Sequence, residues 1–210
     1  MLRALLLIGM GLLSLLCMAC GSENNSAADG EKRAAAQPVA EVQEADNMAG
    51  TGSKSLVVYF SATGNTAKVA KTIAQAAGAD MFEIKAAQPY TAADLNYNND
   101  NCRANLEQRD NTSRPAMAEP APDMSTYDTV YLGYPIWWGK APMIIYTFIE
   151  ESDLAGKTVV PFATSGGSSI GGSVEELQAR CTPQAKWKPG RLFSPSVGAG
   201  EIGAWLDSLK

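Results

Sequence analysis

The 210-residue sequence contains no histidine. The imidazole ring is the usual general base at neutral pH and the commonest transition-metal ligand. Its absence excludes Ser-His-Asp and Cys-His catalysis, together with every zinc site that includes histidine. Gly167 to Gly171 matches the G-x-S-x-G pattern of a hydrolase nucleophile turn. Because no histidine could activate Ser169, ester hydrolysis is not expected.

Basic clusters are also missing. Lys and Arg number 17 against 22 Asp and Glu, which gives a formal net charge of −5, and no run of basic residues occurs. A nucleic-acid partner requires a basic face that displaces counterions, so we expect no nucleic-acid binding. The sequence also lacks the GxxxxGK[ST] and GxGxxG patterns, which disfavours a nucleoside triphosphatase or a dinucleotide-binding domain.

The N-terminus has the features of an export signal. Arg3 precedes the apolar stretch 4–16, which is too short to span a bilayer comfortably. Ala19-Cys20-Gly21 resembles a bacterial lipobox, although Cys17 stands where an aliphatic residue is usual. We expect a signal peptide over 1–19, a lipidated Cys20 and attachment to a bacterial membrane through the lipid only, on the periplasmic or cell-surface side. Ordinary secretion stays an alternative.

Residues 20–54 are rich in Ala, Glu, Ser, Asn and Gly and have few large apolar side chains. Such a segment buries too little surface to offset its ordering entropy, so we expect a disordered linker. The remaining residues 55–210 suit one domain with one core. Export would place Cys102 and Cys181 in an oxidising compartment, where they could form a disulfide or stay unpaired.

Strand and helix patterns alternate along residues 55–210. Unbroken apolar runs predict strands that are buried on both faces, and apolar residues spaced three and four apart predict helices. Expected strands are 56–60, 81–84, 129–134 and 158–163, with a weaker fifth somewhere in 186–192; expected helices are 66–77, 142–149 and one around 202–209.

This alternation predicts an α/β fold with a doubly wound, five-stranded parallel sheet and helices on both faces. Two features fit less well. Pro161 would stand inside the fourth strand, where it cannot donate a ladder hydrogen bond. The Asn-rich segment 96–111 is expected to hold at most a short helix.

Directly after the first expected strand comes Ser61-Ala62-Thr63-Gly64-Asn65-Thr66, which leads into the first helix. A strand-to-helix turn exposes unpaired N–H groups at the positive end of the helix dipole, and glycine lets the backbone wrap around an anion. The hydroxyls of Ser61, Thr63 and Thr66 add donors. With no Lys or Arg in the loop, amides and hydroxyls would hold the anion; simple helix capping is the alternative.

The same six residues resemble the FMN-phosphate loop of the flavodoxin family, T/S-x-T-G-x-T. Two further matches follow the third and fourth expected strands, at 133–139 and 164–168. The resemblance covers 55–210 and implies a flavodoxin-like fold that binds FMN without a metal, the 133–139 loop flanking the flavin ring. The cofactor-binding residues it implies are Ser61, Thr63, Gly64, Asn65, Thr66, Pro135, Ile136, Trp137, Trp138, Gly139, Thr164, Ser165, Gly166, Gly167 and Ser168.

Three functions follow from this interpretation. The first is an electron carrier of the cell envelope that exchanges electrons with a redox partner protein or a small-molecule acceptor. The second is an FMN-dependent reductase of a small molecule such as a quinone, with Tyr97 and Arg103 as candidate substrate residues. The third is a flavin-free binding module on the same fold.

Overall fold

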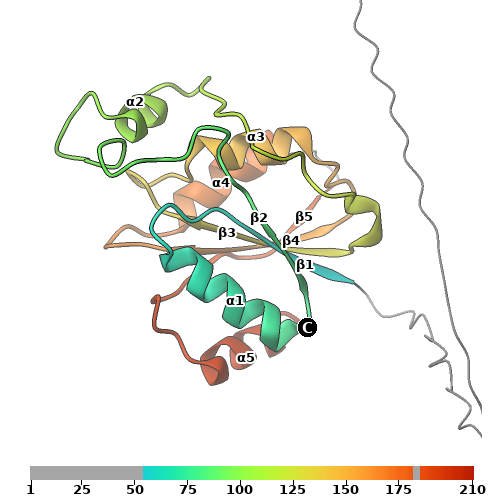
Figure 1. The fold of residues 1–210 in the computed structure, drawn as a ribbon. Coiled ribbons are helices and arrows are strands. Elements are labelled where there is room, and N and C mark those ends of the chain that lie inside the picture. The colour runs from blue at the N-terminus through green and yellow to red at the C-terminus, as the bar shows by residue number, and fades with distance from the viewer. Residues whose placement is uncertain (1–53, 182–184) are drawn as a thin grey trace, which may run out of the picture. The chain divides into compact units, whose positions relative to one another are not determined.

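A computed structural model describes residues 54–181 and 185–210 (Figure 1). The signal peptide expected over 1–19, the lipidation site Cys20 and nearly all of the expected linker lie outside the described residues. Within the described ranges, no helix is long and apolar enough to cross a membrane.

The centre of the domain is a sheet in which every pair of neighbouring strands is parallel. Its order is β2-β1-β3-β4-β5, and β6 also pairs with β4. The short β5 and β6 lie along successive halves of β4 and together form one interrupted fifth strand. The predicted five-stranded, doubly wound sheet is therefore confirmed. The strands are β1 Ser55–Tyr59, β2 Asp80–Glu83, β3 Thr129–Pro135, β4 Thr158–Thr164, β5 Lys186–Trp187 and β6 Arg191–Leu192.

Pro161 lies in the middle of β4, and the interruption of the fifth strand explains how it is accommodated. The carbonyl groups of Val159 and Ala163 accept hydrogen bonds from Lys188 and Phe193 on the fifth-strand side. By strand alternation, the proline nitrogen faces the same side. The proline nitrogen therefore faces the chain between β5 and β6, where the hydrogen-bond ladder is interrupted. Its missing N–H group costs no ladder hydrogen bond there.

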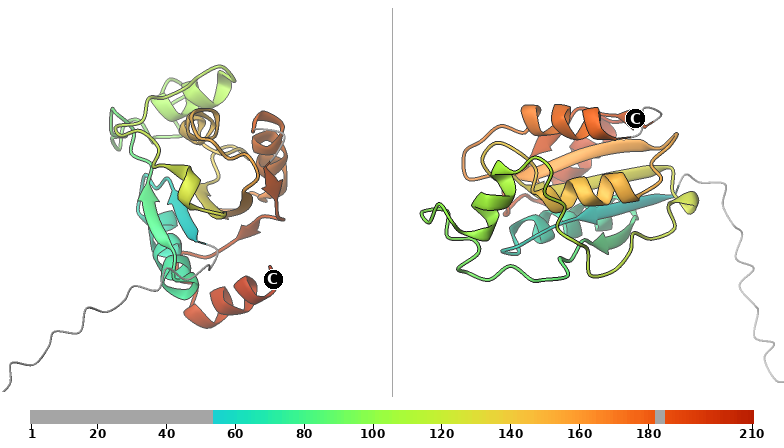
Figure 2. Two further views of the ribbon diagram at one scale, coloured as in Figure 1. Left: turned by 90° about the vertical axis from the view of Figure 1, so that its right-hand side faces the viewer. Right: turned by 90° about the horizontal axis from the view of Figure 1, so that it is seen from above.

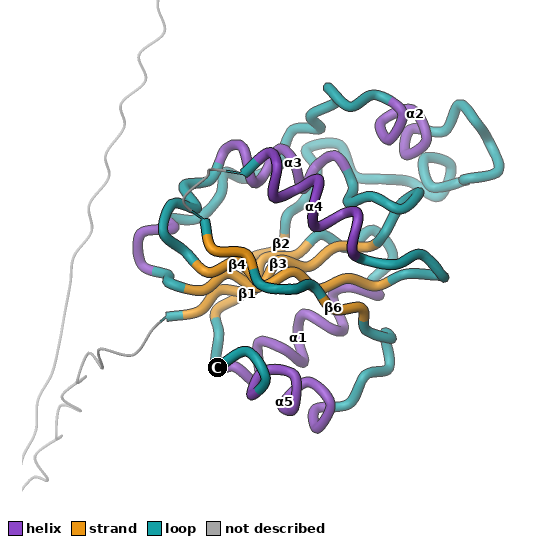
Figure 3. The backbone as a smooth tube through the Cα atoms, turned by 180° about the vertical axis from the view of Figure 1, so that it is seen from behind, coloured by secondary structure: helices purple, strands orange, loops and turns teal. Residues whose placement is uncertain are grey.

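Helices cover both faces of the sheet (Figures 1 and 2). α1 and α5 lie on one face, and α3 and α4 lie on the other, as the view from behind also shows (Figure 3). A short 3-10 turn, η1 Met124–Thr126, precedes β3. The helices are α1 Asn65–Ala77, α2 Arg103–Arg109, α3 Met143–Glu151, α4 Gly171–Arg180 and α5 Ala199–Asp207.

The apolar side chains form one cluster on each face, as two-faced burial requires. In β1, Val57 and Tyr59 pack toward α1 and α5, whereas Leu56 and Val58 pack toward α3 and α4. This alternation explains why β1 reads as an unbroken apolar run. In α1, the side chains with spacing three and four, such as Val69 and Ile73, are fully buried.

The sequence had not indicated the range of α4. Among its side chains only Ser173 and Leu177 are buried, so its apolar stripe is too sparse for a periodicity argument. The short helix allowed within 96–111 is present as α2.

Cys102 and Cys181 are not joined by a disulfide, so the bridge considered from sequence is absent from this structure. Cys102 is the N-cap residue of α2, and Cys181 is the C-cap residue of α4. Each side chain is buried in the apolar cluster beneath its own helix. Burial of this kind is the ordinary environment of a cysteine that acts as a small apolar residue.

Gly133 of β3 creates space for the ring of Phe162, its neighbour on β4. A Cβ atom at position 133 would overlap that ring, with Cε2 at 2.6 Å. Gly133 also accepts a backbone hydrogen bond from Phe60, which lies directly before the 61–66 loop. The close packing of Gly133 against Phe162 therefore holds β3 and β4 together directly beside the 61–66 loop.

We expect Gly133→Ala to destabilise the domain by about 1–3 kcal/mol or more, because the added methyl group overpacks the core. Urea unfolding would measure this loss. Gly203→Ala in α5, where a Cβ meets open space, should be neutral or stabilising by up to about 1 kcal/mol. Adding Phe162→Leu to Gly133→Ala should recover part of the loss. A Gly133→Ala protein as stable as the wild type would contradict this packing.

Candidate functional site

A cavity of about 470 Å³ opens where the carboxyl ends of β1, β3 and β4 meet. The order β2-β1-β3-β4 reverses direction between β1 and β3, and ligands of open parallel sheets bind outside such a point. None of the described residues around the cavity is charged. The lining residues are Ala62, Thr63, Asn65, Tyr97, Pro135, Ile136, Trp137, Trp138, Thr164, Ser165, Gly166 and Pro195.

The 61–66 loop has the backbone of an anion cradle. Gly64 has φ 82°, a left-handed conformation that glycine adopts without steric cost. The first helical bond of α1 runs from the N–H of Lys68 to the carbonyl of Gly64, and the hydroxyl of Ser61 accepts the N–H of Ala67 at 3.1 Å. The N–H groups of Asn65 and Thr66 have no partner within the helix, so they can bind a ligand at its positive end.

The hydroxyl of Thr66 was expected to donate to the ligand, but it is buried beneath the loop. Its side chain is 1% exposed, and its hydroxyl lies 2.9 Å from the hydroxyl of Thr164 at the end of β4. The pair joins the first loop to the loop after β4. Thr66 therefore holds the cradle in place, while Thr63 and Asn65 line the cavity.

The loop after β4 is ordered by its own serine. The hydroxyl of Ser165 accepts the N–H groups of Gly167 and Ser168 at 3.1 and 2.8 Å. Ser165 and Gly166 line the cavity, whereas Gly167 and Ser168 lie outside its lining. The loop thus presents its first residues to the cavity and uses the next two to fix its turn.

A tight turn after β3 presents Trp138. Trp137 and Lys140 exchange both backbone hydrogen bonds, at 2.9 and 3.0 Å. Between them, Trp138 and Gly139 have φ 52° and 79°, which is the pattern of a type I′ turn. Glycine suits this turn, but a bulky residue at positive φ is strained. Among the described residues, Trp138 is the only non-glycine residue with positive φ.

The two tryptophans have different environments. The ring of Trp137 is 5% exposed and packs edge-on against Phe60 and Tyr90, with centroids 5.7 and 5.4 Å away. Trp138 is 65% exposed. Trp137 therefore forms the floor of the cavity, and Trp138 forms an accessible aromatic wall.

Tyr97 enters the cavity from the long segment between β2 and β3, residues 84–128, which we call the excursion. Its ring lies 6.5 Å from Trp138 and 6.2 Å from Trp137, centroid to centroid. The phenol of Tyr97 is protonated at neutral pH, as tyrosine ordinarily is, and burial raises its pKa further, to about 12. It can therefore donate a hydrogen bond into the cavity.

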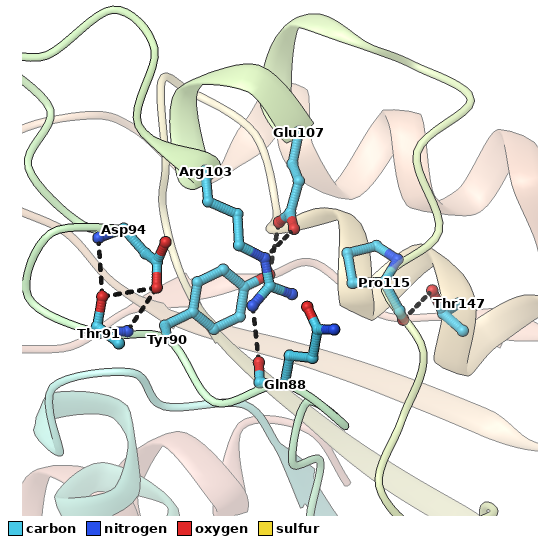
Figure 4. A network of polar contacts seen from close by, with 8 residues as sticks. All are labelled: Gln88, Tyr90, Thr91, Asp94, Arg103, Glu107, Pro115 and Thr147. Atoms are coloured by element: carbon cyan, nitrogen blue, oxygen red, sulfur yellow. Dashed lines mark hydrogen bonds and ion pairs between the residues drawn. The ribbon is translucent and has the colours of Figure 1, made fainter.

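Arg103 does not line the cavity, contrary to its suggested role as a substrate residue. Its guanidinium lies over the ring of Tyr90 at 4.0 Å and donates to Glu107 at 2.6 Å and to the carbonyl of Gln88 at 2.7 Å (Figure 4). Arg103 therefore joins α2 to the chain that follows β2. Between α2 and β3, the carbonyl of Pro115 accepts a hydrogen bond from the hydroxyl of Thr147 of α3 at 3.0 Å. This bond fixes the part of the chain that leads back toward β3.

Several expected residues lie close to the cavity without lining it: Ser61, Gly64, Thr66, Gly139, Gly167 and Ser168. The structure adds Ala62 and Pro195, which the sequence did not indicate. Pro195 follows β6, a strand too short to be located by pattern. Among the described residues, no cluster of three or more His, Cys, Asp or Glu side chains is placed to hold a metal ion.

Together the fold and the cavity define a class of protein: a doubly wound α/β domain that can hold an anionic group on backbone amides beside an uncharged, aromatic wall. The sequence model of the flavodoxin family matches residues 54–209. The chain therefore belongs to the flavodoxin family.

Solved structures agree with this assignment. A protein of known structure from Bacteroides eggerthii DSM 20697 is 52% identical, with 75% of this chain and 98% of that chain covered and a TM-score of 0.71. Another, from Bacteroides uniformis ATCC 8492, is 47% identical, with coverages of 74% and 99% and a TM-score of 0.71. A Lactobacillus acidophilus NCFM flavoprotein, solved in complex with FMN, shares the fold at 22% identity, coverages of 74% and 99% and a TM-score of 0.59. No curated protein matches the chain significantly.

Gly64 and Gly78 offer a matched pair of substitutions at the two ends of α1. Both have positive φ, and a Cβ at either position would meet open space. We expect Gly64→Ala and Gly78→Ala each to lower stability by about 1–2 kcal/mol, the backbone cost of a left-handed residue. Only Gly64→Ala should also weaken phosphate-dependent ligand binding, as measured by titration with FMN. Equal effects of the two variants on affinity would show that the 61–66 loop does not hold the phosphate.

Proposed function

We propose that the protein binds FMN noncovalently in this cavity and carries electrons between partners in the cell envelope. The observation that supports it best is the union of two different surfaces in one cavity. One is an amide and hydroxyl cradle at the start of α1, and the other is the exposed ring of Trp138. A ligand that carries both a phosphate and a flat apolar ring matches this pair.

The residues present fit FMN. Backbone amides of Asn65 and Thr66 and the hydroxyl of Thr63 would hold the phosphate. Trp138 would stack on the flavin ring, and the loop of Ser165 and Gly166 would face its polar edge. Bound FMN supplies the redox chemistry, while the protein supplies binding, orientation and electrostatics.

The electrostatic surroundings favour a low reduction potential. The cavity lining carries no cation among the described residues, and the whole chain has a formal net charge of −5. Both features disfavour the additional negative charge that reduction places on the flavin ring. This repulsion is stronger beside an apolar wall than in water. We therefore infer a midpoint potential below that of free FMN, which suits an electron donor.

Reduction of a small molecule such as a quinone is the second candidate function. The observation that favours it is the position of Tyr97, whose protonated phenol lines the same cavity as Trp138. A hydrogen-bond donor there could bind the carbonyl oxygen of an acceptor. Arg103 is not part of this proposal, because it does not line the cavity and its guanidinium contacts Tyr90, Glu107 and Gln88.

The purified protein should be yellow and should bind FMN more tightly than riboflavin, because only FMN presents a phosphate to the 61–66 loop. Fluorescence titration of both ligands measures the ratio. Trp138→Ala should weaken both ligands by a similar factor, about five- to tenfold for a lost aromatic contact of about 1 kcal/mol or more. Gly64→Ala should instead lower the preference for FMN.

A colourless protein that takes up no FMN would contradict this function and favour a flavin-free binding module. A midpoint potential at or above that of free FMN would contradict the electrostatic argument. For the FMN-loaded protein, steady-state oxidation of NADH or NADPH with an added quinone separates the two candidates. A carrier should show no turnover, whereas turnover that Tyr97→Phe reduces would identify a reductase.

For the location, we propose export followed by lipid attachment at Cys20, on the strength of the apolar stretch 4–16 and Ala19-Cys20-Gly21. Membranes from cells that express the wild-type chain should retain the protein after a high-salt wash, because the attachment is hydrophobic. Cys20→Ser should lose lipid labelling, and Cys102→Ser should keep it. Wild-type protein that carries no lipid would restore ordinary secretion as the better hypothesis.

A further inference from the structure

The cavity has a second layer of support in α2, centred on the side chain of Asn105. This side chain is 1% exposed, and its amide has partners on both sides. Its Nδ2 donates to the carbonyls of Tyr97 and Asn99 at 3.1 and 2.9 Å. Its Oδ1 accepts the indole N–H of Trp138 at 2.7 Å.

These contacts fix the orientation of the amide. If the amide were rotated by half a turn, its oxygen would face two carbonyl oxygens and its NH₂ group would face the indole N–H. Every contact would then be repulsive, and the buried polar atoms would be left unpaired. Asn105 can therefore offer only its oxygen to Trp138.

Asn105 joins two walls of the cavity that come from distant parts of the chain. Tyr97 lies in the excursion after β2, and Trp138 lies in the turn after β3. A neighbour on α2 supports the same turn: the buried Gln108 donates from Nε2 to the carbonyls of Trp137 and Ala141 at 3.0 and 3.2 Å. One short helix thus holds both the backbone of the turn and the ring that the turn presents.

The turn needs such support. Trp138 has φ 52°, and a strained residue persists only when its surroundings over-determine its conformation. With 65% of its surface exposed, Trp138 has little packing to hold its ring. The bond to Asn105 is therefore a main constraint on the direction in which the indole plane faces.

We propose that Asn105 is a positioning residue of the FMN site, which holds the ring of Trp138 in its stacking orientation before the cofactor binds. This inference rests on the function proposed above. Binding to an ordered ring does not cost the side-chain entropy of ordering it, so the ordering strengthens FMN affinity. The same amide also holds the backbone carbonyl of Tyr97, whose side chain lines the cavity.

Trp138→Phe and Asn105→Ala remove the same hydrogen bond from its two ends. Each should raise the dissociation constant for FMN about fivefold, the factor that corresponds to a hydrogen bond of about 1 kcal/mol. The double variant should bind no more weakly than the weaker single variant, because the bond can be lost only once. Trp187→Phe is the matched control, since the indole N–H of Trp187 is buried without a partner among the described residues.

Two further readouts separate positioning from general stability. In the FMN-free protein, the indole N–H resonance that disappears in Trp138→Phe should exchange with solvent faster in Asn105→Ala. The visible circular dichroism of bound FMN should also change in Asn105→Ala, because the ring that stacks on the flavin is no longer held. Trp138→Phe removes the same bond and leaves the bonds of Asn105 to Tyr97 and Asn99 in place, so it also serves if Asn105→Ala does not fold.

Different results overturn different statements. Wild-type protein that takes up no FMN overturns the proposed function and the positioning role together. Wild-type protein that binds FMN, with additive effects of Trp138→Phe and Asn105→Ala, overturns the positioning role alone. The same holds if the indole exchange in Asn105→Ala is as slow as in the wild type.

Discussion

The parallel pairing of β3 with both β1 and β4 is the constraint on which the site depends. It brings three carboxyl ends, far apart in the sequence, to one edge of the sheet. Two backbone bonds extend the pairing past the strands: Phe60 donates to Gly133, and Ile136 donates to Thr164. The hydroxyl pair of Thr66 and Thr164 then closes the edge. Loops that are flexible in isolation are thus held at fixed spacing by the ladder beneath them.

The second support is the excursion that contains α2. Within it, Arg103 stacks on Tyr90 and pairs with Glu107. Thr147 of α3 holds it to the fold by donating to the carbonyl of Pro115. Behind the wall of the cavity, Asn105 and Gln108 support the turn of Trp138. The backbone of that turn is strained at Trp138, and such a conformation persists when its surroundings over-determine it. The two backbone bonds between Trp137 and Lys140 and the side chains of Asn105 and Gln108 supply that constraint. A binding site on loops can be ordered in this way before any ligand is present.

Much of the fold was predictable because it depends on local pattern. Two-faced burial makes β1 and β4 continuous apolar runs, and the stripe of Val69 and Ile73 marks α1. The interrupted fifth strand and α4 were not predictable in detail. Each pair of residues in β5 and β6 is too short for periodicity, and α4 buries only Ser173 and Leu177. The accommodation of Pro161 likewise depends on a break in a neighbouring strand, which no local signal announces.

For the site, the sequence by itself determined the loop 61–66, because a strand, a glycine and a helix start in succession are enough to create an anion-binding backbone. It also placed Trp137 and Trp138 after the third strand. Only the tertiary structure decided their roles, since burial of Trp137 and exposure of Trp138 depend on what packs against the turn. It likewise directed Thr66 to Thr164, and it placed Asn105, which belongs to an Asn-rich segment expected at the surface, behind the wall of the cavity. Such roles depend on contacts between residues distant in the sequence, and those contacts exist only once the sheet has formed.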